Sequence, residues 1–87
     1  MASNTALKNV IMTTLLLSGG TATSTTVYVA VGSVFPSLRK NYDDMTYNIR
    51  WARMSLAGAG LIAQSKVRGE WSLTAEGRKA ARALFVD

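Results

Sequence analysis

Cysteine and histidine are absent from this 87-residue sequence. Their absence excludes disulfide bonds, thiol nucleophiles, imidazole bases and zinc sites built on sulfur or imidazole ligands. Of the five acidic residues, only Asp43 and Asp44 are adjacent. Adjacent residues point in different directions from a helix or strand, so this pair does not suit catalysis, and we expect it in a solvated loop at a helix entry. We therefore expect no enzymatic activity, no cofactor and no metal ion.

The sequence also has no apolar run long enough to span a bilayer. The stretch from Val10 to Leu17 is short for the core of a signal peptide, two threonines interrupt it, and only Lys8 precedes it as a basic residue. We expect a cytoplasmic protein with no membrane partner. The stretch is interpreted as part of an amphipathic first helix that ends at Gly19-Gly20. Its apolar side contains Leu7, Val10, Ile11, Thr14 and Leu15.

What the sequence does contain is enough apolar residues for one small core and an excess of positive charge. Hydrophobic residues make up 48% of the chain, which is typical of a single globular domain, here residues 1–87. Ten lysines and arginines give a net charge of +5, and all of them except Lys8 lie between Arg39 and Arg82. Such a surplus favours a polyanionic partner.

The region after Gly20 indicates a short strand and a second helix. Thr21 to Thr26 is rich in β-branched residues, and Ser24 or Thr25 is the expected helix cap. Apolar residues then recur at helical spacing from Val27 to Leu38. The alternation of Val27, Val29 and Val31 also allows a strand, but the cap and Pro36 favour the helix. The polar segment from Pro36 to Thr46, which includes Arg39 and Lys40, is the expected turn before a third helix.

The third helix is expected to be capped by Asp44 or Thr46 and to end at Gly58 or Gly60. A projection at about 100° per residue separates two faces. The expected core face contains Ile49, Ala52, Ser55, Leu56 and Ala59, with Trp51 at its border as a packing residue. The opposite face contains Thr46, Tyr47, Arg50, Arg53, Met54 and Ala57, with no acidic residue.

That opposite face suits a DNA groove. Arg50 and Arg53 can donate paired hydrogen bonds to guanine or bind phosphate, and Tyr47 and Met54 can contact the C5-methyl group of thymine or methylcytosine. Asn48, in the first turn, can reach a phosphate or an adenine edge. The simpler alternative is that both arginines only keep a surface helix soluble.

A hairpin and a last helix complete the expected fold. The strands Leu61–Ser65 and Glu70–Leu73 are joined by a turn, residues 66–69, in which Lys66 and Arg68 can bind phosphate, although charged turns also serve solubility. Ile62, Trp71 and Leu73 are expected to face the helices. Thr74 is expected to cap a helix from Ala75 to about Phe85. Small residues on that helix suit close packing, and Leu84 and Phe85 are expected to pack on the core or to form a homodimer interface.

This order of elements predicts an α+β, mainly α fold: a winged helix-turn-helix with a three-helix core, a β-hairpin wing and a C-terminal helix. The run from Trp51-Ala52-Arg53 through Gly60-Leu61-Ile62 and Arg68-Gly69-Glu70-Trp71 to Leu73-Thr74 and Gly77-Arg78 resembles the amino-terminal winged-helix domain of Mrr-type restriction proteins. The resemblance implies that the chain binds double-stranded DNA, often methylated, as the specificity module of a nuclease that lies elsewhere. A transcriptional regulator and a module that binds no nucleic acid are the alternatives.

Overall fold

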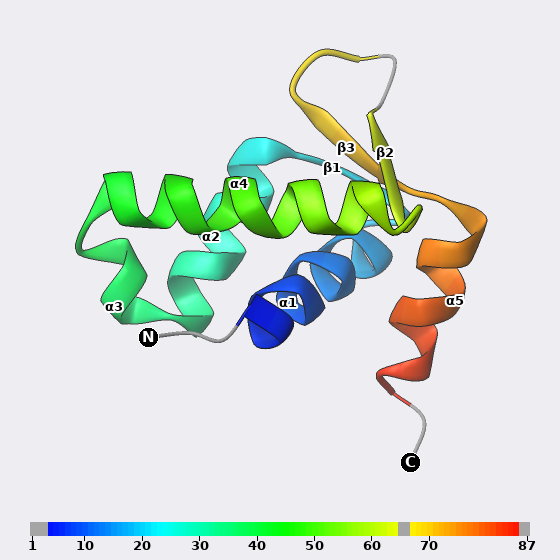
Figure 1. The fold of residues 1–87 in the computed structure, drawn as a ribbon, viewed down its shortest axis with the longest axis horizontal. Helices are drawn as coiled ribbons and strands as arrows, with labels where there is room; N and C mark the ends of the chain where they lie inside the picture. Colours follow the sequence, from blue (N-terminus) through cyan, green and yellow to red (C-terminus); the bar gives the residue numbers. More distant parts are fainter. Residues whose placement is uncertain (1–3, 65–66, 86–87) are drawn as a thin grey trace.

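The computed structural model describes residues 4–64 and 67–85, which form five helices and three short strands (Figure 1). In chain order these are α1 (Asn4–Leu17), β1 (Thr21–Thr23), α2 (Ser24–Val34), α3 (Pro36–Arg39), α4 (Tyr42–Gly58), β2 (Ile62–Gln64), β3 (Glu70–Leu73) and α5 (Ala75–Ala83). The expected α+β, mainly α class is confirmed. The region from Ser24 to Val34 is a helix, so the strand alternative is wrong.

The three strands form one antiparallel sheet in the order β1-β3-β2. β2 and β3 are consecutive, whereas β1 joins from far away in the sequence, with Ala22 opposite Trp71. The amide of Ser24, the first residue of α2, donates to the carbonyl of Gly69 at 2.8 Å. The base of the hairpin is therefore tied both to β1 and to the start of α2.

Glycines end two of the helices as expected. After α1, Gly19 has a φ of 88°, and the amide of Gly20 donates to the carbonyl of Leu15 at 2.8 Å. After α4, Gly60 has a φ of 77°, and the amide of Leu61 donates to the carbonyl of Leu56 at 2.9 Å. Both are Schellman closures, which need a left-handed residue that glycine adopts without strain.

The starts of α2 and α4 differ from the expectation. Thr23 caps α2 in place of Ser24 or Thr25, because its hydroxyl accepts from the amide of Thr26. Asn41 caps α4, and its side-chain oxygen accepts from the amide of Asp44 at 3.2 Å.

The earlier start changes the position of the acidic pair. Asp43 and Asp44 lie in the first turn of α4, where the positive end of the helix dipole favours acidic side chains. The expected helix-entry loop is therefore wrong, and α3 together with the start of α4 occupies most of the segment expected to be a turn.

The core lies between the helices and the sheet. Its buried apolar residues are Leu7, Ile11, Met12, Leu15, Ala22, Val27, Val31, Leu38, Met45, Ile49, Ala52, Leu56, Ile62, Trp71, Leu73 and Ala81. On α4 the buried positions are spaced by three and four residues from Met45 to Leu56. The buried positions leave out two residues of the expected core face, so the observed core face is narrower than the expected one. Ser55 and Ala59 are exposed, and so is Trp51 at 53%. The expected packing role of Trp51 is wrong.

α5 begins as expected and ends early. The hydroxyl of Thr74 accepts from the amide of Gly77 at 2.9 Å, which confirms the cap. The helix ends at Ala83, and Leu84 and Phe85 are exposed, so the expectation that they pack on the core is wrong. Within residues 4–64 and 67–85, no helix has the length and apolar character needed to cross a membrane.

Candidate nucleic-acid interface

α4 lies across the molecule with one long side open to solvent, and the hairpin rises beside its C-terminal half (Figure 1). Three large side chains occupy the middle of that open side: Tyr47, Trp51 and Met54, each more than half exposed. The rings of Tyr47 and Trp51 meet edge to face, with their centroids 6.2 Å apart. We call these three residues the apolar crest. Tyr47 and Met54 were expected here, and Trp51 was not.

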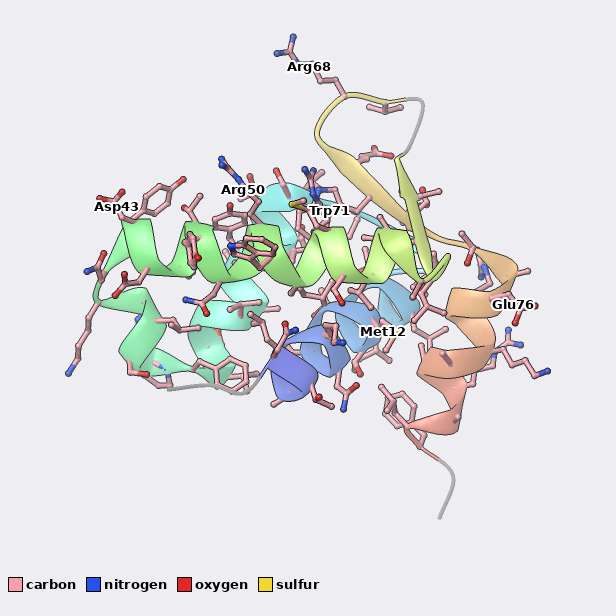
Figure 2. The ribbon with its side chains drawn as sticks, viewed as in Figure 1. Met12, Asp43, Arg50, Arg68, Trp71 and Glu76 are labelled. Carbon is pink, nitrogen blue, oxygen red and sulfur yellow. The ribbon has the colours of Figure 1, made fainter. Side chains whose placement is uncertain are left out.

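The two arginines of α4 lie on the flank that faces the hairpin. The guanidinium carbon of Arg53 lies 5.6 Å from the centre of the Trp71 ring on β3, which is a cation–π contact. Arg50 is exposed one turn earlier, and Figure 2 shows its side chain extending toward the same side as the hairpin. The contact with Trp71 restricts Arg53, whereas Arg50 is free to reach a ligand.

A surface hollow of about 500 Å³ lies between α4, the start of α2 and the base of the hairpin. Its lining residues are Ser24, Thr25, Tyr28, Val29, Tyr42, Thr46, Ile49, Arg50, Arg53, Gly69 and Trp71. Among the residues that the structure describes, no aspartate or glutamate lines this hollow. Ser24 and Thr25 lie in the first turn of α2, where the positive end of the helix dipole favours an anion, while the amides of Ser24 and Thr26 already donate to Gly69 and Thr23. The hollow therefore combines two arginines with a helix N-terminus.

Two predicted residues on α4 are less exposed than expected. The hydroxyl oxygen of Thr46 is buried and has no hydrogen-bond partner, although the residue lines the hollow. The side-chain amide of Asn48 donates to the carbonyl of Asp44 at 2.7 Å. Asn48 thus satisfies the backbone of its own helix, and it lies half-buried beside the crest.

The other predicted cations lie apart from this centre. Arg68 is exposed in the hairpin turn and extends away from the body of the molecule (Figure 2). Arg39 is the last residue of α3 and Lys40 is its C-cap, at the opposite end of α4 from the hairpin (Figure 1). Lys66 lies outside the described residues. The structure therefore gathers Thr46, Arg50 and Arg53 at the hollow and Tyr47 and Met54 on the crest, but it leaves Arg39 and Lys40 distant.

Sequence reasoning missed Trp51, Ser24 and Thr25 as site residues. The signal for Trp51 was its spacing, since it follows Tyr47 by four residues and precedes Met54 by three. Ser24 and Thr25 could not be found locally, because their position depends on the pairing of β1 with β3.

Comparison of the chain with models of protein families, with curated proteins and with solved structures found no match. No group of three or more acidic side chains that could hold a metal ion occurs in the part of the chain that the structure describes.

Proposed function

We propose that the chain is a winged helix-turn-helix domain that binds double-stranded DNA. The observation that carries this proposal is the open side of α4, where arginines and large apolar residues lie next to a hollow without acidic lining residues among those described. The order of the helices and the sheet order β1-β3-β2 support it, because they place a hairpin directly beside α4.

The dimensions of α4 suit the major groove. A helix with its side chains is about 10–12 Å across, and the major groove of B-DNA is about 12 Å wide. With α4 in the groove, Arg50 reaches base edges and the crest faces the C5-methyl groups of pyrimidines. Arg53, which is held against Trp71, lies nearer the DNA backbone.

Phosphate contacts are expected around the groove. The first turn of α2 and Arg53 form an environment for a phosphate at the hollow, because the positive end of the helix dipole and a cation lie together there. The hairpin turn, with Lys66 and Arg68, reaches a second stretch of backbone or the minor groove.

The resemblance to Mrr-type winged-helix domains extends the proposal. On that basis the domain selects DNA in the cytoplasm for a nuclease that lies elsewhere, and it prefers methylated cytosine through Tyr47 and Met54. Both side chains are exposed on the crest, so they can bury apolar surface against a methyl group while the base stays stacked.

The two arginines of α4 provide a test of base recognition. Arg50→Ala is expected to remove about 1–3 kcal/mol of binding free energy and to relax the preference at particular base pairs. Arg53→Ala is expected to weaken binding to all sequences more evenly, because its position suits the backbone. Selection from a random duplex library measures both effects. Lys79→Ala, which removes one exposed cation from α5, is the control. If Lys79→Ala and Arg50→Ala have the same effect, α4 is not the reading helix.

Methyl recognition has a separate test. Competition between methylated and unmethylated duplexes should show a preference for the methylated one, and Tyr47→Ala or Met54→Ala should reduce it by about 1 kcal/mol per lost methyl contact. Equal binding of the two duplexes by the unaltered protein would show that the domain does not read methylation. DNA binding itself would then still stand.

A further inference from the structure

The exposure of Trp51 extends the apolar crest toward α1. Its side chain is 53% exposed and contacts the ring of Tyr47. Large aromatic residues that gather on an open surface usually mark a contact site, whereas single exposed apolar residues do not. The wing-facing flank of α4 holds Arg50 and Arg53 and does not include Trp51. Trp51 therefore lies on the other flank of the crest, away from the hollow.

A cation from a different helix lies on that other side. The ammonium of Lys8 on α1 donates to the hydroxyl of Ser55 at 3.5 Å. Ser55 follows Trp51 by one helical turn, so Lys8 lies beside the C-terminal half of the crest. The crest is thus bordered by arginines on the hairpin side and by a lysine on the α1 side.

We propose that Lys8 and Trp51 form the second flank of the DNA contact surface. Lys8 binds a phosphate of the strand opposite the one that the hairpin contacts, and Trp51 packs against sugar and base edges at that border of the groove. This inference rests on the proposed DNA binding and adds its geometry. Contacts with the DNA backbone hold α4 in the groove on both sides.

Charge favours DNA over a protein as the occupant of this flank. Cations on both sides of an apolar strip match a groove with a phosphate chain on each side. The acidic residues of α4, Asp43 and Asp44, lie in its first turn. Ser55 comes 11 positions after Asp44, which corresponds to about 16 Å along a helix, so the acids are remote from Lys8.

The two tryptophans allow a direct test of the Trp51 contact. In Trp71→Phe, Trp51 is the only tryptophan and reports on its own environment. We expect a duplex to lower its accessibility to acrylamide at least two-fold, at the concentrations where the anisotropy of a labelled duplex saturates. If Trp71→Phe does not fold, Trp51→Phe leaves the buried Trp71 as the only tryptophan, and under excitation selective for tryptophan the difference from the unaltered protein gives the Trp51 signal.

Two results of this experiment have different meanings. Saturated anisotropy with an unchanged accessibility of Trp51 overturns this inference and leaves the proposed function intact. No anisotropy change for the unaltered protein contradicts the proposed function itself, and the inference fails with it.

Lys8 is tested by a matched pair of variants. Lys8→Gln should reduce the slope of log affinity against log salt by about 0.9, the loss expected for one phosphate contact. Lys79→Gln removes the same charge from α5 and should leave the slope nearly unchanged. If the two variants change the slope equally, Lys8 acts only through net charge, and the second phosphate contact is wrong.

Discussion

The two tryptophans differ in what they contribute. Trp71 is only 7% exposed, lies opposite Ala22 in the sheet and supports Arg53. Trp71→Ala is therefore expected to cost roughly 3 kcal/mol or more of unfolding free energy, whereas Trp51→Ala should change it by less than about 0.5 kcal/mol. Urea unfolding of both variants measures this. A large loss of stability in Trp51→Ala would show that its ring is packed against the core.

Thr46 carries a second prediction about a single residue. Its hydroxyl oxygen is buried without a partner, and an unsatisfied buried polar atom lowers stability. Thr46→Val replaces the hydroxyl with a methyl group of similar shape and should raise the unfolding free energy by about 1 kcal/mol. Thr46→Ser keeps the hydroxyl and serves as the control. Thermal unfolding of the two variants measures the change in stability. A destabilised Thr46→Val would mean that the hydroxyl does have a partner.

Among the elements, the joint between β3 and α5 explains why a threonine and a glycine occur in the segment from Leu73 to Gly77. The hydroxyl of Thr74 donates to the carbonyl of Gly60 at 2.6 Å and also caps α5. A Cβ on Gly77 would collide with the carbonyl of Leu61, so only glycine allows α5 to approach this closely. Threonine and glycine three residues apart therefore join the last helix to the end of α4.

Two glycines, one in this joint and one at the end of α4, are expected to respond in opposite ways to substitution by alanine. Gly77→Ala should cost about 3 kcal/mol, because the backbone of Leu61 must move. Gly58→Ala should stabilise the protein by up to about 1 kcal/mol, because Gly58 is helical and a Cβ there would meet nothing within 4 Å. Chemical denaturation of both variants gives the comparison. Equal effects would contradict the described packing of α5.

The helices also show how far local sequence determines this fold. The ends of α1 and α4 were predicted, because a left-handed glycine acts over a few residues. The start of α4 was not, because Asn41 competes with Asp44 and Thr46 as a cap and nothing local decides between them. The earlier start brings Met45 into the helix, one turn before Ile49 on the buried face. Trp51 was misassigned for a different reason: it lies at the border of the buried face, and the helical projection alone does not decide whether a large ring at that border is buried.

At the scale of the whole molecule, the surface near α4 depends on contacts that are distant in sequence. β1 pairs with β3 across almost 50 residues, and this pairing brings the first turn of α2 to Gly69 and the hollow. Lys8 reaches α4 only because α1 packs beneath it (Figure 1). The arginines and the tyrosine of the site could be predicted from the helix pattern, but the hollow and the second flank required the tertiary structure.

The salt dependence of binding to a short duplex tests the central claim most directly. Between about 50 and about 200 mM salt, log affinity should fall against log salt with a slope between about −3.6 and about −4.5, as expected for four or five phosphate contacts. Lys66→Ala together with Arg68→Ala should weaken binding to all sequences and reduce the steepness by one to about two units, with the fold unchanged. Binding that is absent, or that shows no dependence on salt, would contradict the assignment of this domain to DNA.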